Sequence, residues 1–213
     1  YCSEPGIAIQ GWQFVLALTL GFLTLLLSFK LSLKKSDLIF AFLIWGIAIA
    51  IWWSVPMDVL KSSFYAPFAY PLGKPLPYSD AGFYDYLSQG LLLGNGFLAQ
   101  IPPRPLYVVF LAGLRALVGI HDYAKIMLGQ TIVYALFPVV LYFLGKTLHS
   151  RAAGITIAFF GIFREWTNLL VSSQTRVSNS RTTLTDLPTA LVLSLVALLV
   201  IYWLKKRRDK PLF

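Results

Sequence analysis

The chain has 213 residues, of which 57% are hydrophobic and only 13% are charged, whereas soluble domains carry about 25% charged residues. With a mean hydropathy of +0.70, this composition excludes an ordinary water-soluble fold. The net charge of +9 does not indicate a nucleic-acid partner, because the basic residues form short clusters at the ends of apolar runs, as in membrane proteins whose positive residues stay cytoplasmic.

Residues 1–54 are predicted to form a transmembrane helical hairpin. A first apolar run covers 7–29 and a second begins after Ser36 and Asp37 and reaches Ser54. Both runs are long enough to cross a bilayer. The basic turn between them, with Lys30, Lys34 and Lys35, is expected on the cytoplasmic side. No basic stretch precedes the first run, which favours a retained helix over a signal peptide.

Residues 55–105 are predicted to form an ordered external loop. Eight prolines interrupt this stretch, and no lipid-facing helix tolerates so many missing amide donors. The segment 79–93 lacks proline and is followed by Gly94-Asn95-Gly96. We therefore expect a helix that begins at Ser79 or Asp80, ends before these glycines and lies on the membrane surface with an amphipathic face.

Residues 106–204 hold four further apolar segments, at 106–120, 126–144, 152–163 and 187–204. The first and third are short for a perpendicular span. A second polar loop is predicted at 164–186, and 205–213 is a basic cytoplasmic tail. The fold class is thus an all-α transmembrane bundle of about five to six helices. The sequence leaves open whether 106–120 crosses the membrane. That crossing decides on which side of the membrane each basic cluster lies.

Asp80 is the candidate catalytic residue. A carboxylate at the start of a juxtamembrane helix can accept a proton from an acceptor hydroxyl or amine. Alternatively, Asp80 is only a helix cap that suits the positive end of the helix dipole. Asp85, five residues on, would point away from Asp80 and is expected to be a solvated surface residue.

Three further charged residues are candidates for substrate binding. Arg104 stands among prolines before an apolar run, where a guanidinium can bind a phosphate through two parallel bonds or simply reach the interface. Arg164 and Glu165 either face the same side as Asp80 or form a mutual ion pair. Gln130 and Tyr134 are expected to bond to a neighbouring helix, and no spacing of histidine or cysteine suggests a metal.

Several short motifs together resemble the GT-C superfamily of membrane glycosyltransferases, especially protein mannosyltransferases and the lipid A aminoarabinose transferase. The matching residues are Asp80, Ala81 and Tyr84, then Gly94 and Gly96, then Pro102-Pro-Arg-Pro-Leu-Tyr107. In the family the last element reads Arg-Pro-Pro-Leu-Tyr, so the order departs slightly. The segments Leu144–Gly154 and Thr185-Asp-Leu-Pro188 also look like family elements.

The resemblance implies transfer of a sugar from a polyprenyl-phosphate donor at the external face of a bacterial plasma membrane. Asp80 would be the base, Tyr84 would belong to the same motif, and Arg104 or Arg164 with Glu165 would lie near the donor phosphate. No cofactor is implied beyond this lipid donor, and a divalent metal stays undecided. Family members are usually longer, so the chain would be an N-terminal portion or a shortened relative.

A second hypothesis makes the chain a non-catalytic subunit whose transmembrane helices pack against other membrane proteins. A transporter is less favoured, because the charges stand at segment ends rather than in mid-membrane. The enzyme hypothesis predicts that Asp80 and the arginines converge on one external cavity open to lipid, whereas the subunit hypothesis predicts flat helix faces covered by partner chains.

Overall fold

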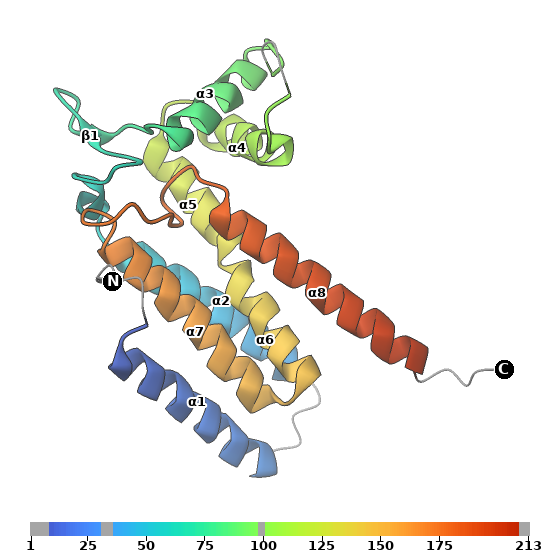
Figure 1. Ribbon diagram of the computed structural model, residues 1–213. Helices are drawn as coiled ribbons and strands as arrows, with labels where there is room; N and C mark the ends of the chain where they lie inside the picture. Colours follow the sequence, from blue (N-terminus) through green and yellow to red (C-terminus); the bar gives the residue numbers. More distant parts are fainter. Residues whose placement is uncertain (1–8, 31–35, 98–100, 209–213) are drawn as a thin grey trace, which may run out of the picture. The chain divides into compact units, whose positions relative to one another are not determined.

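The computed structural model describes residues 9–30, 36–97 and 101–208, and the fold is all-α apart from one short β ladder (Figure 1). The all-α prediction is therefore confirmed. The α-helices are α1 (Gly11–Lys30), α2 (Ser36–Ser54), α3 (Asp80–Leu92), α4 (Pro105–Val118), α5 (Tyr123–Tyr134), α6 (Leu136–Leu148), α7 (Arg151–Leu170) and α8 (Asp186–Arg208).

The chain divides into two compact units. Trp52–Tyr134 and Glu165–Pro188 belong to the first unit, and Ala8–Ile51, Ala135–Arg164 and Thr189–Phe213 belong to the second. The first unit holds α3, α4 and α5, and the second holds α1 and α6 with most of α2, α7 and α8.

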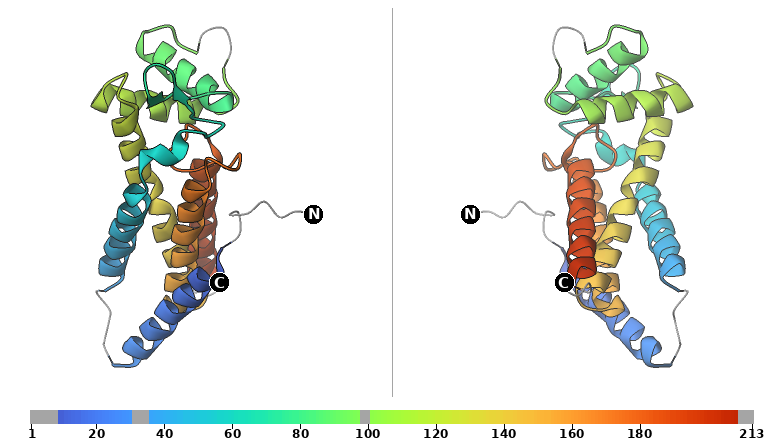
Figure 2. Two further views of the ribbon diagram at one scale, coloured as in Figure 1. Left: turned by 90° about the vertical axis from the view of Figure 1, so that its left-hand side faces the viewer. Right: turned by 90° about the vertical axis from the view of Figure 1, so that its right-hand side faces the viewer.

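Helices α3 and α4 pack against each other in the first unit and lie side by side in both views of Figure 2. The packed face of α3 carries Ala81, Tyr84, Asp85 and Ser88, all buried, at spacings of three and four residues that share one helical face. The buried residues of α4 are Tyr107, Val108, Leu111, Ala112, Leu114 and Arg115. This packing decides which residues of the predicted loop become core.

The proline-rich stretch before α3 contains structure that the sequence did not indicate. A 3₁₀ helix, η1, covers Met57–Leu60, and β1 (Phe68–Ala69) pairs antiparallel with β2 (Lys74–Pro75). The predicted helix over 79–93 is confirmed by α3, which is followed by Gly94 with a φ of 84°. Glycine adopts this left-handed conformation without the cost that other residues incur, so α3 ends where the sequence predicts.

The predicted apolar segment 126–144 corresponds to two helices, α5 and α6, that meet at Ala135. Pro138 lies four residues after Tyr134 and has no amide hydrogen to donate to the Tyr134 carbonyl. The missing hydrogen bond explains why the helix is interrupted at this position.

In the second unit, Asp37 in the first turn of α2 connects α6 and α7. Its carboxylate accepts hydrogen bonds from the Tyr142 hydroxyl at 2.8 Å and from Arg151 Nε at 2.8 Å, and it forms an ion pair with Lys146. Helices α6 and α7 also approach closely, since a Cβ on Gly145 would lie 2.8 Å from the Cα of Gly154. The basic residues predicted between these helices are thus partly neutralised by Asp37.

Within the described residues, three helical stretches are long and apolar enough to cross a membrane: Asp37–Ser54, Tyr123–Leu148 and Asp186–Arg207. Two shorter apolar helical stretches cover Gly11–Leu27 and Pro105–Val118. Helix α7 extends beyond the predicted 152–163 segment to Leu170, so the connection to α8 is shorter than the predicted loop at 164–186. Lys34, Lys35 and residues 209–213 lie outside the described residues, whereas Lys205 to Arg208 of the predicted tail form the end of α8.

Candidate functional site

Asp80 lies at the beginning of α3 and is exposed. Ser79, not Asp80, occupies the cap position, with a φ of 55° and no side-chain capping bond. The Ser79 carbonyl accepts the backbone N–H of Phe83 at 3.0 Å. The interpretation of Asp80 as the cap is therefore wrong by one residue, although its carboxylate still lies in the first turn, where the helix dipole favours negative charge.

Arg104 holds the cap position of α4 and is also exposed. Its guanidinium donates a hydrogen bond to the Tyr84 hydroxyl at 3.0 Å. This bond raises the pKa of Arg104, and the negative charges of Asp186 and Asp80 raise it further. Of the predicted site residues, Arg104 and Tyr84 are thus in direct contact, while Asp80 and Asp186 act on the Arg104 guanidinium through their charges.

The other two predicted site residues differ from each other in their surroundings. Arg164 is exposed and belongs to the second unit. Glu165 is buried in the first unit, where its carboxylate accepts the backbone N–H of Ser180 at 2.5 Å. Two adjacent residues on a helix point in directions about 100° apart, which explains why one is exposed and the other is core.

The connection before α8 forms a buried polar segment, 179–185, that packs on α5. The Gln130 amide donates to the carbonyls of Ser180 at 2.9 Å and Thr182 at 3.0 Å and accepts from the Tyr107 hydroxyl at 3.1 Å. The prediction that Gln130 bonds to a neighbouring helix is confirmed by its contact with Tyr107 of α4. The Thr183 hydroxyl donates to the Ala81 carbonyl at 2.8 Å, which connects this segment to α3.

Arg181 is the basic residue of this segment, and it is almost fully buried. It is 1% exposed and donates to the carbonyls of Trp52 at 2.9 Å and Trp53 at 3.0 Å. Its guanidinium also lies over the Trp53 ring, 5.1 Å from the centroid. Burial lowers the pKa of Arg181 to about 10, so it stays charged at neutral pH and ties the segment to the end of α2.

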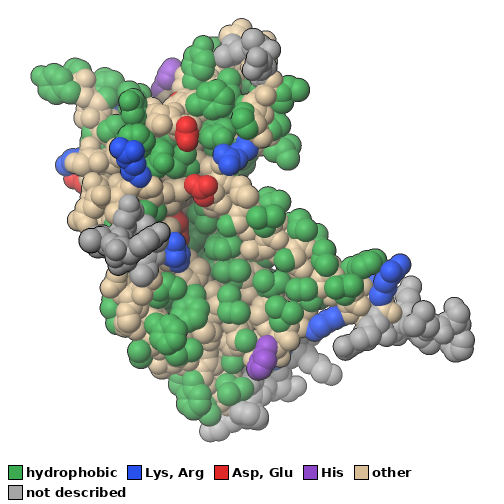
Figure 3. All heavy atoms as spheres, viewed as in Figure 1, with side chains coloured by type: hydrophobic (Ala, Val, Ile, Leu, Met, Phe, Trp, Pro, Cys, Tyr) green, Lys and Arg blue, Asp and Glu red, His purple; other side chains and the backbone are tan. Residues whose placement is uncertain are grey.

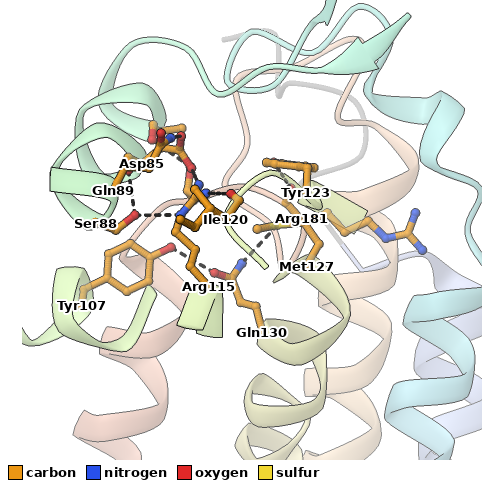
Figure 4. A network of polar contacts seen from close by, with 12 residues as sticks. Asp85, Ser88, Gln89, Tyr107, Arg115, Ile120, Tyr123, Met127, Gln130 and Arg181 are labelled. Atoms are coloured by element: carbon orange, nitrogen blue, oxygen red, sulfur yellow. Dashed lines mark hydrogen bonds and ion pairs between the residues drawn. The ribbon is translucent and has the colours of Figure 1, made fainter. Parts of the chain in front are cut away.

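Asp85 contradicts the expectation of a solvated surface residue, since it is only 8% exposed and forms an ion pair with Arg115 of α4. Figure 4 shows this network, in which Arg115 also donates to the Ser88 hydroxyl at 3.0 Å and to the Ile120 carbonyl. The Gln89 amide donates to the second carboxylate oxygen of Asp85 at 2.8 Å. Burial raises the pKa of Asp85, while the charge of Arg115 opposes the rise.

Sequence reasoning missed Arg115 as a site residue. The available signal was a single basic residue in the last turn of an otherwise apolar helix, because such a charge needs a partner when the helix is buried. Asp85 gave no such signal, because only the packing of α4 decides which face of α3 is buried.

A cavity of about 130 Å³ borders this ion pair. Residues 75–77 of the β hairpin and the segment after it form one wall, and Asp85 and Gln89 of α3 form another. His121, from the turn between α4 and α5, and Tyr123, at the start of α5, complete the lining of the cavity. All of these residues belong to the first unit.

The two charged arrangements differ in what they can do chemically. The exposed carboxylate of Asp80 can take a proton, and the nearby Arg104 can stabilise a developing negative charge. The Asp85–Arg115 pair is held by neighbouring side chains and borders the cavity. Among the described residues, no group of three or more His, Cys, Asp or Glu side chains is placed to hold a metal ion.

Comparison with known proteins adds no assignment, because no family model, curated protein or solved structure matches this chain.

Proposed function

We propose that the chain is a GT-C-like membrane protein that transfers a sugar from a polyprenyl-phosphate donor to an acceptor at the external face of a bacterial plasma membrane. The observation that carries the proposal is the Arg104 guanidinium, which a hydrogen bond of 3.0 Å to the Tyr84 hydroxyl restrains. The exposed carboxylate of Asp80 contributes to the electrostatic field at this guanidinium. In the GT-C-like motifs, Asp80 corresponds to the base, and Arg104 is one of the two arginines that the resemblance connects with the donor phosphate.

In the proposed reaction, Asp80 accepts the proton of the acceptor hydroxyl or amine as its oxygen or nitrogen attacks the anomeric carbon of the sugar. The bond from that carbon to the phosphate oxygen breaks, and the electron pair leaves with the polyprenyl phosphate. Arg104 stabilises the charge that grows on this leaving group. The Tyr84 hydroxyl restricts the guanidinium and thereby reduces the reorganisation that the step requires.

The proposed membrane arrangement has five crossings: α1, α2, the α5–α6 pair, α7 and α8. Helix α4 has 14 residues and is about 21 Å long, shorter than a hydrocarbon core of about 30 Å. We therefore assign α3 and α4 to the external interface. This arrangement puts the basic residues after α1, between α6 and α7 and at the end of α8 on one cytoplasmic side, as the positive-inside rule requires.

The proposed arrangement can be tested by introducing single cysteines and measuring their reaction with a membrane-impermeant maleimide. In a Cys2→Ser background, Tyr70→Cys and His121→Cys flank α3 and α4, and His149→Cys lies between α6 and α7; all three positions are exposed. We expect the first two to react in intact spheroplasts and the third only after permeabilisation. Opposite accessibility of Tyr70→Cys and His121→Cys would show that α4 crosses the membrane.

The catalytic proposal is tested in membranes that contain the native protein, with polyprenyl-phosphate hexose and pentose donors. We expect Asp80→Asn to slow release of polyprenyl phosphate by at least about 100-fold, the usual effect of losing a general base. Asp58→Asn is the matched control, since Asp58 is an exposed carboxylate of the same loop. Equal activity of the two variants would rule out Asp80 as the base, and no turnover by the wild type would reject the transferase proposal.

A structural subunit is the second candidate, favoured by the outer surface of α8. Figure 3 shows hydrophobic side chains along this helix, and only 6% of its most apolar stretch is buried. Such a surface contacts either lipid or the helices of another membrane protein. Mild-detergent purification followed by intact mass measurement separates the two, because stoichiometric partner chains would support the subunit and a longer native chain would support a transferase.

A further inference from the structure

We propose that the cavity beside Asp85 and Arg115 is a binding site for a single neutral sugar ring. This site goes beyond the proposed transfer reaction, since Asp80 does not line the cavity. Asp80 and Asp85 are five residues apart on α3, so their side chains point about 140° apart around the helix. Binding in the cavity is therefore expected to be independent of the Asp80 carboxylate.

The charge of the cavity favours a neutral ligand. Asp85 and Arg115 are 8% and 4% exposed and neutralise each other as an ion pair. A phosphate or carboxylate ligand would compete with Asp85 for Arg115 and leave the aspartate buried without its partner, which is costly. A cationic ligand would do the same to Arg115.

The remaining hydrogen-bonding capacity fits hydroxyl groups. A guanidinium has five N–H donors, and three hydrogen bonds of Arg115 are made to Ser88, Ile120 and Asp85. Each carboxylate oxygen of Asp85 accepts one bond and has further lone pairs. Donors and acceptors thus stand side by side, as required by vicinal hydroxyls, each of which both donates and accepts.

The opposite walls of the cavity are apolar. Leu76 and Pro77 approach from the segment after β2, and Ile126 contributes from α5. A pyranose ring has hydroxyls around its edge and C–H groups on its faces, so it matches a cavity with both kinds of wall. The volume of about 130 Å³ is below the roughly 150 Å³ of a cavity that holds benzene, and a hexopyranoside is larger than benzene, so one edge of the ring would enter and the rest would stay outside. The cavity therefore suits the edge of one ring.

Saturation-transfer NMR on the purified full chain in nanodiscs tests this site, with methyl α-glucopyranoside, methyl α-mannopyranoside and methyl β-galactopyranoside as probes. We expect saturable binding of at least one glycoside, and none of inorganic phosphate at the same concentration. Absence of saturable binding for all three glycosides would overturn the proposal, and so would phosphate binding that displaces them.

Two variants locate the binding. Leu76→Trp fills the cavity and is expected to abolish the signal, whereas Leu72→Trp, an exposed leucine of the same hairpin outside the cavity, leaves it unchanged. Gln89→Ala removes one polar wall and is expected to weaken binding about tenfold, the effect of one lost hydrogen bond. If Leu76→Trp does not fold, Gln89→Ala alone tests whether the sugar binds in this cavity. Wild-type affinity of Gln89→Ala for the glycosides would overturn the assignment.

Asp80→Asn separates this site from the proposed transfer reaction. We expect that variant to lose release of polyprenyl phosphate and to keep wild-type glycoside binding. Loss of binding in Asp80→Asn together with wild-type binding in Leu76→Trp would place the sugar at the exposed surface and overturn the cavity site, without bearing on the catalytic role of Asp80.

Discussion

Helices α3 and α4 carry two aspartate–arginine combinations that differ in almost every physical respect. Asp80 and Arg104 stand at the beginnings of the two helices and are exposed. Asp85 and Arg115 lie on the packed faces and form a buried ion pair. The same residue types in the same helices therefore have different surroundings: the first combination is open to solvent, and the second is part of the core and also borders a cavity.

The two aspartate–arginine combinations differ because one is in contact with water and the other is not. Water screens exposed charges, so a pair at the surface contributes little to stability. A buried pair has lost its hydration, and removal of one partner leaves a charge that nothing compensates. The two combinations can thus be separated by experiments on stability and on activity.

The largest expected effect is that of Arg115→Met. This change leaves Asp85 buried without its countercharge and should lower the free energy of unfolding by about 3–5 kcal/mol, measured by denaturant unfolding in detergent. Arg104→Met is the matched control and should change stability little, because Arg104 is exposed. Similar losses in both variants would contradict the distinction between the two combinations.

The double variant Asp85→Leu with Arg115→Met should recover most of that loss. Replacement of a buried ion pair by apolar side chains is often neutral or stabilising. The same unfolding measurement checks the recovery. A double variant as unstable as Arg115→Met alone would mean that Ser88, Gln89 and the Ile120 carbonyl, rather than the unpaired carboxylate, determine the loss.

A smaller effect concerns pH. Burial raises the pKa of Asp85 above its ordinary value of 3.8, so the folded protein binds more protons at this residue than the unfolded chain does. The contribution of Asp85 to the free energy of unfolding therefore decreases as pH rises from about 3.8 through the raised pKa. Asp85→Asn should remove this part of the pH dependence, and unfolding curves parallel to the wild type would refute it.

The smallest expected effect on stability is that of Tyr84→Phe. The change removes the acceptor of the 3.0 Å bond from Arg104 and should cost less than about 1 kcal/mol, since the guanidinium can bond to water instead. Release of polyprenyl phosphate should fall several-fold because Arg104 loses its fixed orientation. A variant with full activity would show that Tyr84 does not position Arg104.

The sequence by itself determined the apolar class of the chain, the all-α fold and the extent of α3. These features depend on local signals: apolar run length, proline density and the glycines after Leu93. The break at Ala135 had a local cause too, in the missing amide of Pro138. Asp80 and Arg104 were selected from their positions at a predicted helix start and among prolines, and Tyr84 because short motifs resemble a known family.

Only the tertiary structure decided which charged residues are buried. Asp85 was expected in solvent, and its burial depends on the face of α3 that α4 covers, which no local pattern specifies. Glu165 and Arg181 became core because the segment before α8 packs against α5 and the end of α2. The physical reason is that the cost of a charge depends on the groups around it in space, and those groups come from distant parts of the chain.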